Sequence, residues 1–280
     1  MSIGEILSVA GKALKSRYKD TIKLLLAFML IIFLISFFES ILVTIIAFIP
    51  NIGKLFSVIM RILVSLVMVP ISFGFIKQSI LLYNGEENIS AFDFLKFAKE
   101  SWKSVWKLTL NLFVKYIGAV IIFMLSMSCS IMVSTGFYDT KGIFPILSLV
   151  GFIISFIWII VLSLNYAFVN HELAYGENGR ISKEIICDSA KYMQGNKGKF
   201  ILLEIIMLVL SFILTLLISI PVINILAIIG MLILFVPYMQ YVFVAFYQSV
   251  RNEKISDGNI NIEKMDDNLS NTNDDPIQNS

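Results

Sequence analysis

The chain has 280 residues, of which 58% are hydrophobic and only 15% are charged. Soluble domains contain about 45–50% apolar and about 25% charged residues, so one soluble core could not bury this much apolar surface. The formal net charge is +2, and the lysines cluster beside apolar runs. This arrangement argues against a nucleic-acid partner and favours contact with membrane lipids.

Long, mostly apolar runs predict about six membrane-spanning helices, because such a helix needs about 20 mostly apolar residues. The first four runs cover residues 21–50, 55–76, 108–134 and 143–169. The last run, 200–250, is long enough for two crossings, and we expect a turn at 220–224, where Pro221 removes a helical donor. The sequence therefore predicts an all-α polytopic membrane bundle, with an integral membrane domain over residues 1–250. Residues 251–280 are rich in Asn, Asp and Ser and are predicted to be a disordered cytoplasmic tail.

Basic residues predict the orientation of these spans. They gather before the first span and in the polar segments 77–107 and 170–199, whereas the other side has only Lys54, Arg61 and Lys141. By the positive-inside rule, both termini and the two long polar segments face the cytoplasm.

An internal repeat accompanies the spans. Residues 81–90 align without a gap with residues 173–182, and the same register pairs Lys107 with Lys199. A second ungapped register matches Lys15, Tyr18, Lys19, Lys23 and Leu24 with Lys99, Trp102, Lys103, Lys107 and Leu108. We expect three units, each an amphipathic cytoplasmic helix followed by a membrane hairpin. Chance similarity between segments rich in Leu and Lys is the alternative.

The segment before each hairpin has apolar residues at helical spacing on one face and lysines on the other. In the second unit Leu95, Ala98 and Trp102 form the apolar face, and Ser90 and Asp93 resemble a capping box. We expect these helices to lie in the membrane interface with their lysines toward anionic headgroups. Packing against the rest of the protein is the alternative. The candidate headgroup contacts are Lys15, Lys19, Lys23, Lys99, Lys103, Lys107, Lys191 and Lys199.

Glu39 and Arg61 are the informative charges within the spans, because an unpaired charge in hydrocarbon is expensive. At a rise of ~1.5 Å per residue, both fall in the outer half of adjacent antiparallel helices, where they could form a salt bridge. A substrate or ion site is the alternative. Pro70 and Pro237 each lie in the second helix of a hairpin and predict a kink. Such kinks serve either static packing or the movement of a transporter.

No residue pattern predicts enzymatic chemistry. His171 lacks the second histidine of a zinc-protease motif and is expected to be an interfacial polar residue. The sequence contains no glycine-rich phosphate loop, catalytic triad or paired carboxylates, so we predict no enzyme activity, no cofactor and no metal. Gly151 with Ser155, like Ser126 with Ser130, has the small-residue spacing of a close helix contact.

Three short motifs stand before the first span, before the fifth and in the last. They are Ala13-Leu14-Lys15-Ser16-Arg17-Tyr18, then Asp188-Ser189-Ala190-Lys191-Tyr192-Met193-Gln194-Gly195-Asn196-Lys197, and Val236-Pro237-Tyr238 leading to Ala245-Phe246-Tyr247. Together they resemble a family of uncharacterised multi-pass membrane proteins from Gram-positive bacteria, domain-of-unknown-function family 975. The resemblance implies a bacterial plasma membrane and six helices, and no established activity. More distantly, the chain is similar to the membrane domain of some glycerophosphodiester phosphodiesterases, without their soluble catalytic domain.

The leading functional hypothesis is a non-enzymatic structural or accessory protein of the plasma membrane. The first alternative is a small transporter or permease subunit that uses the region of Glu39 and Arg61 and the proline kinks. The second is self-immunity against membrane-active peptides. The sequence identifies membrane lipids as partners and names no protein partner.

Overall fold

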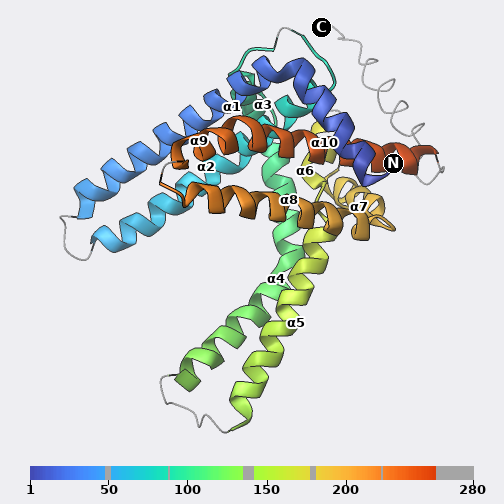
Figure 1. The fold of residues 1–280 in the computed structure, drawn as a ribbon. Helices are drawn as coiled ribbons and strands as arrows, with labels where there is room; N and C mark the ends of the chain where they lie inside the picture. Colours follow the sequence, from blue (N-terminus) through green and yellow to red (C-terminus); the bar gives the residue numbers. More distant parts are fainter. Residues whose placement is uncertain (48–51, 88, 135–141, 177–180, 222, 257–280) are drawn as a thin grey trace, which may run out of the picture.

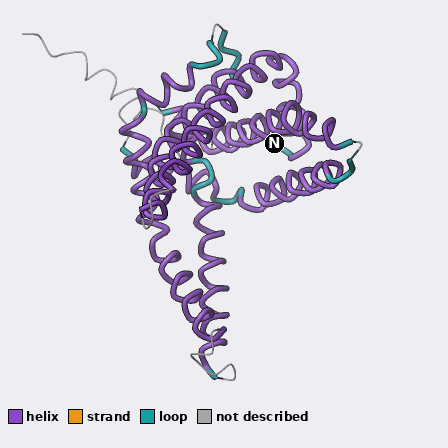
Figure 2. The backbone as a smooth tube through the Cα atoms, turned by 90° about the vertical axis from the view of Figure 1, so that its left-hand side faces the viewer, coloured by secondary structure: helices purple, strands orange, loops and turns teal. Residues whose placement is uncertain are grey.

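The computed structural model describes residues 1–47, 52–87, 89–134, 142–176, 181–221 and 223–256. Within these ranges the chain is helical apart from short turns, and no strand occurs (Figures 1 and 2). The helices are α1 (Ile3–Ala47), α2 (Ile52–Tyr83), α3 (Asp93–Glu100), α4 (Trp102–Ser134), α5 (Ile143–Asn165), α6 (Val169–Tyr175), α7 (Ser182–Met193), α8 (Lys197–Ile218), α9 (Asn224–Gly230), the π-helical turn η1 (Met231–Phe235) and α10 (Val236–Ser256).

Six helical segments of the described chain are long and apolar enough to cross a membrane, by length and composition. They are Ile3–Ile46, Lys54–Tyr83, Trp102–Ser134, Ile143–Tyr175, Lys197–Ile218 and Asn224–Ser256. The predicted all-α class with six candidate spans is therefore confirmed, and the chain has the architecture of a multi-pass membrane protein. The predicted turn in the last long run also holds, since α8 ends at Ile218 and α9 begins at Asn224.

Several helices extend beyond the apolar runs. The helix α2 continues to Tyr83, past the predicted end of the second span at residue 76. The helix α10 continues to Ser256, so the prediction of a disordered tail is wrong for residues 251–256. Residues 257–280, the rest of that predicted tail, lie outside the described residues.

The same order of elements occurs three times. Unit 1 (residues 3–83), unit 2 (93–175) and unit 3 (182–256) each begin with an amphipathic helix, break, and continue into a hairpin of two long helical segments. In unit 1 the break is a kink within α1 rather than a gap between helices. The structure thus has the predicted threefold pattern of helix plus hairpin.

The break between the amphipathic helix and the first span falls at matching positions. Arg17 has φ −116° and ψ 19° inside α1, and Ser101 has φ −91° and ψ 4° between α3 and α4. These two residues are partners in the register that matches Lys15 with Lys99. The register that pairs Lys107 with Lys199 matches Ser101 with Met193, the last residue of α7. The agreement of sequence register and backbone geometry is what a true repeat requires.

Each amphipathic helix packs on the hairpin of another unit. Phe94 and Ala98 of α3, in unit 2, are buried against the α1–α2 hairpin of unit 1, where they contact residues such as Phe75. The contact is close, because a Cβ atom added to Gly74 of α2 would lie 2.0 Å from the carbonyl oxygen of Phe94. Burial of a side chain such as Phe94 contributes roughly 1.5–3 kcal/mol.

The pattern repeats between units 2 and 3. Ile185 and Ile186 of α7, in unit 3, are buried with Leu108 of α4 and Val169 of α6, both in unit 2. The amphipathic helix of a unit therefore packs on the hairpin of the unit before it.

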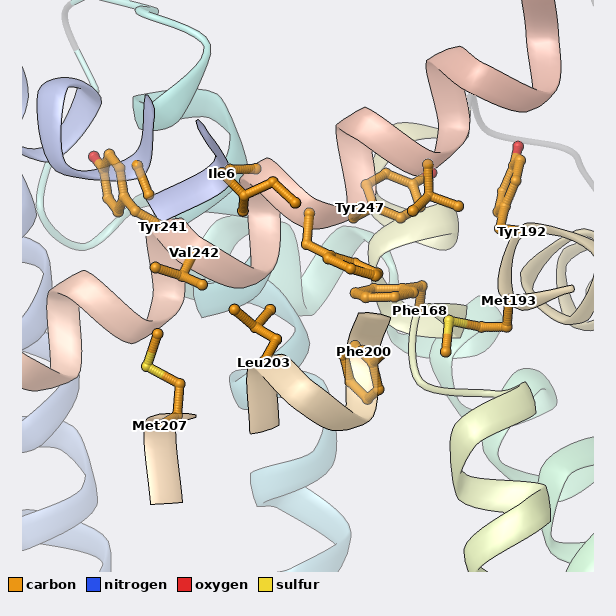
Figure 3. Close-up of a cluster of buried hydrophobic side chains, with 14 of the residues drawn as sticks. Ile6, Phe168, Tyr192, Met193, Phe200, Leu203, Met207, Tyr241, Val242 and Tyr247 are labelled. Carbon is orange, nitrogen blue, oxygen red and sulfur yellow. The ribbon is translucent and has the colours of Figure 1, made fainter. Parts of the chain in front are cut away.

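The N-terminal helix closes the series into a ring. Ile6 and Ala10 of α1, in unit 1, are buried in the same cluster as Tyr241 and Val242 of α10, in unit 3 (Figure 3). In the two sequence registers Ala10 matches Phe94, which matches Ile186. Each of these three residues is therefore buried at the matching position of a contact between two units.

This packing decides between the two interpretations of the amphipathic segments. The predicted stripes face protein where Ala10, Ala98 and Ile186 are buried against other units. The expectation that the stripes lie in the lipid interface is therefore wrong for these positions. Phe94, the most buried side chain of α3, was not part of the predicted stripe. Trp102, which is 42% exposed, is the member of the stripe that the packing leaves free.

The far parts of the hairpins lie outside this common core. Figures 1 and 2 show the α4–α5 hairpin extending from the core in a different direction from the α1–α2 hairpin. Large apolar side chains are exposed along both, for example Phe33, Phe38, Leu125 and Ile146. Such surfaces are unfavourable in water, which fits the hairpins as the lipid-facing part of the molecule.

Candidate functional site

The predicted pair of Glu39 and Arg61 does not form an ion pair in the described chain. Glu39 is partly buried on α1, Arg61 is exposed on α2, and the ion pairs found among described residues do not join them. Both lie in the far half of their hairpin. The buried contacts between the two helices, such as Leu25 with Phe75, belong to the core half. A substrate or ion site at Glu39 and Arg61 stays a prediction.

The predicted headgroup lysines are all exposed. This holds for Lys15, Lys19, Lys23, Lys99, Lys103, Lys107, Lys191 and Lys199, which we call the repeat lysines. Two of them pair with an acid one turn away on their own helix, Lys23 with Asp20 at 3.0 Å and Lys191 with Asp188 at 3.2 Å. Exposed pairs of this kind contribute little to stability, so these side chains remain available to an external partner.

The two prolines lie in different surroundings. Pro70 is buried inside α2, which is helical throughout. Pro237 is buried at the start of α10, directly after the π-helical turn η1. Because proline has no N–H to donate, a widened turn just before it is the expected local adjustment. Pro237 is therefore the position where the helix geometry changes.

The most polar part of the core was not predicted from the sequence. Glu172 of α6 is only 1% exposed, and its carboxylate accepts a hydrogen bond from the hydroxyl of Tyr247 on α10. Tyr192 of α7 packs edge-on against Tyr247 with ring centroids 5.9 Å apart. Burial, and to a lesser extent the Glu172 carboxylate, raises the pKa of Tyr192, so its hydroxyl stays neutral and able to donate. We call Glu172, Tyr175, Tyr192, Tyr247 and Arg251 the Glu172 cluster.

The remaining members of the Glu172 cluster surround the same aromatic ring. The ring of Tyr175 lies 5.2 Å from that of Tyr247, and the Arg251 guanidinium lies 5.3 Å over the Tyr175 ring. Such a cation–π contact contributes about 0.5–2 kcal/mol, depending on its exposure to water. The ring of His171, which is partly buried, lies 5.5 Å from that of Tyr247, so this histidine packs against the Glu172 cluster.

A junction beside the Glu172 cluster joins all three units. The side-chain oxygen of Asn84, just after α2, accepts hydrogen bonds from Gln248 of α10 at 2.5 Å and from the Tyr175 hydroxyl at 3.3 Å. Gln248 also donates to the Tyr175 hydroxyl. Asn84 follows unit 1, Tyr175 ends unit 2 and Gln248 lies in unit 3, so the three hairpins are connected at their core ends.

A second polar network holds the kink of α1. The Arg17 guanidinium donates to the carbonyl of Gly85 at 2.6 Å and lies 3.5 Å from the Glu87 carboxylate. The Thr21 hydroxyl donates to the Arg17 carbonyl at 2.9 Å, a backbone oxygen close to the break in the helix. These contacts fix the direction in which the N-terminal helix leaves the first span.

The predicted small-residue contact between α4 and α5 is confirmed for Ser126, Gly151 and Ser155, whereas Ser130 is exposed. A Cβ atom on Gly151 would lie 2.3 Å from the Ser126 hydroxyl oxygen, and the Ser148 hydroxyl donates to the Ser126 carbonyl at 2.7 Å. Ser155, also on this side of α5, is fully buried. Beside the contact is a shallow groove of about 340 Å³, lined by Ser126, Met127, Ser130, Val133, Pro145, Ser148, Leu149 and Phe152. The hydroxyls of Ser126 and Ser148 bond within the hairpin, which fits the groove as a packing feature.

The sequence contained one signal for the Glu172 cluster. Tyr192 and Tyr247 belong to two of the three motifs that carry the family resemblance, and these motifs meet here although they are far apart in the chain. No group of three or more His, Cys, Asp or Glu side chains in the described ranges could hold a metal ion. Comparison with models of protein families, with curated proteins and with solved structures found no match, so the resemblance to family 975 stays a prediction.

Proposed function

We propose that this chain is a non-enzymatic protein of a bacterial plasma membrane with a structural or accessory role, and with both termini in the cytoplasm. Six apolar helices support a multi-pass arrangement. The exposed repeat lysines support the orientation, because basic residues are retained on the cytoplasmic side.

The observation that carries the non-enzymatic role is how the polar side chains between the units are used. Glu172 bonds with Tyr247, and Asn84, Tyr175 and Gln248 bond with one another. These contacts join separate units of the ring. Such contacts form a rigid junction, because hydrogen-bonded polar groups hold the units in one arrangement.

Cysteine labelling tests the membrane and the orientation. Cys129 and Cys187 would first be replaced by Ser, and single cysteines placed at Glu100, beside the repeat lysines, or at Lys54, at the opposite end of α2. In intact cells, a membrane-impermeant maleimide should modify the Lys54→Cys variant only. The Glu100→Cys variant should react after permeabilisation. The reverse order would refute the proposed orientation.

A flux assay tests the accessory role against transport. The purified chain would be reconstituted in vesicles that contain a pH-sensitive dye, and proton flux driven by a potassium diffusion potential would be compared with protein-free vesicles. We expect no added flux. A flux that disappears in the Glu39→Gln variant would contradict the accessory role and support the transporter alternative. A partner that co-purifies in mild detergent at a fixed ratio would support the accessory role.

A further inference from the structure

We propose that the repeat lysines bind the headgroups of anionic phospholipids. The inference rests on the proposed membrane location and names the ligand of its cytoplasmic face. Lys15, Lys99 and Lys191 occupy one matching position of the three units, and Lys23, Lys107 and Lys199 occupy another. One lipid-facing charge pattern is therefore presented three times.

The packing of the amphipathic helices leaves their charged faces outside. In unit 2, Phe94 and Ala98 are buried against unit 1, while Lys99 and Lys103 are exposed. With its apolar stripe used by the protein, such a helix cannot bind the membrane by inserting that stripe. The helix can still contact lipid through the charges of the lysines on its exposed face.

The repeat lysines lie where the first span of each unit begins. Lys103 and Lys107 are in the first two turns of α4, and Lys199 is in the first turn of α8. A spanning helix enters the lipid through the headgroup layer, so lysines at this level are adjacent to phosphate. Trp102 lies exposed beside Lys103, as an amphipathic residue does at a membrane interface.

Six of the eight repeat lysines make no ion pair in the part of the chain that the structure describes. The other two, Lys23 and Lys191, pair within their own helices. At the opposite end the described basic side chains of the first hairpin are Lys54 and Arg61, both exposed. An anionic leaflet is thus complementary to one end of the molecule.

The test uses the tryptophan beside the lysines of unit 2 as a reporter. A chain carrying Trp106→Phe and Trp158→Phe retains Trp102 alone, and would be reconstituted in phosphatidylcholine vesicles with increasing fractions of brominated phosphatidylglycerol or brominated phosphatidylcholine. Bromine quenches tryptophan fluorescence on contact, so the two curves give a relative affinity. We expect a preference for phosphatidylglycerol of at least about fivefold, which one lysine near an anionic surface supplies.

Replacing Lys99, Lys103 and Lys107 by Gln in this reporter chain should bring the preference close to one. The matched control, Lys54→Gln with Arg61→Gln, should leave the preference unchanged. The proposal would be overturned if the triple variant kept its preference for phosphatidylglycerol. It would also be overturned if the parent reporter chain showed no such preference. Either result would assign the lysines to another partner or to none.

A second reporter separates this proposal from the membrane location on which it rests. A chain carrying Trp102→Phe and Trp106→Phe retains Trp158, which is exposed within α5 and packs near Gly118 of α4. If both brominated lipids quench Trp158, the α4–α5 hairpin lies in the bilayer. This conclusion does not depend on the fluorescence of Trp102. Without quenching of Trp158, the membrane location itself fails.

Discussion

The hydroxyl groups of Thr21 on α1 and Tyr241 on α10 lie 2.7 Å apart, and both side chains are buried. The pair joins the first and last candidate spans at the point where the ring of units closes. Tyr83 at the end of α2 packs edge-on against Tyr241, with ring centroids 5.5 Å apart. Tyr241 is thus the common neighbour of both helices of unit 1.

Replacing Tyr241 by Phe should lower the free energy of unfolding by about 0.5–1.5 kcal/mol, the net value of one buried hydrogen bond. The loss stays small because the Thr21 hydroxyl keeps its bond to the Arg17 carbonyl. Thermal unfolding in detergent, followed by circular dichroism, would measure it. Tyr116→Phe is the control, since the Tyr116 hydroxyl makes only a long, exposed contact of 3.4 Å with Ser163. An equal effect of both variants would contradict the role of the Thr21–Tyr241 bond.

Tyr247→Phe should be more harmful, with a cost of about 1–3 kcal/mol. The change removes the Tyr247 donor from the buried Glu172 carboxylate, and breaking a buried hydrogen bond costs more than breaking an exposed one. The same unfolding measurement applies, with Tyr238→Phe as the comparison. The Tyr238 hydroxyl makes a 3.3 Å bond to the Leu7 carbonyl in a partly buried position, and its loss should cost less.

Gly74→Ala should disrupt the contact between α2 and α3. The new methyl group would lie 2.0 Å from the Phe94 carbonyl oxygen, a backbone atom that can move only if the whole of α3 moves. We expect a loss of about 1–3 kcal/mol, typical of overpacking. Gly230→Ala is the matched control, because a Cβ there meets nothing within 4 Å and alanine favours the helix. Equal stability of the two variants would show that α3 does not pack as described.

Gly151→Ala tests the α4–α5 contact and can be rescued. The new Cβ would lie 2.3 Å from the Ser126 hydroxyl oxygen but 3.5 Å from its Cβ, which is ordinary contact. The single variant should be destabilised, while the double variant Gly151→Ala with Ser126→Ala should recover most of the loss. The interaction energy from this double-mutant cycle is the measurement. Strictly additive effects would mean that the two residues do not touch.

The spans were predictable from the sequence because hydrocarbon thickness sets a length, and apolar runs of that length are rarely anything else. The turn before Asn224 was predictable for a local reason, the proline at 221. The threefold order was also visible, since matching lysines and leucines kept their spacing. These features depend only on residues that are near one another in the chain.

Contacts between units could not be predicted in the same way. The spacing of Leu95, Ala98 and Trp102 identifies an apolar face but does not say whether lipid or protein covers it. Helical rise placed Glu39 and Arg61 at a similar depth, but it fixes neither the rotation of a helix nor the separation of two helices. Glu172 lies just after the apolar run 143–169, and no local pattern placed it in the core. Only its contact with Tyr247, which follows it by 75 positions, shows that it is in the core.

The closed ring has a consequence for how the chain is made. The N-terminal helix leaves the ribosome first, but the surface that covers Ile6 and Ala10 belongs to α10, which is synthesised last. Until translation reaches that segment, the apolar stripe at the N-terminus has no native partner. A prematurely ended chain therefore keeps an N-terminal helix with an uncovered apolar face, which chaperones and proteases can recognise.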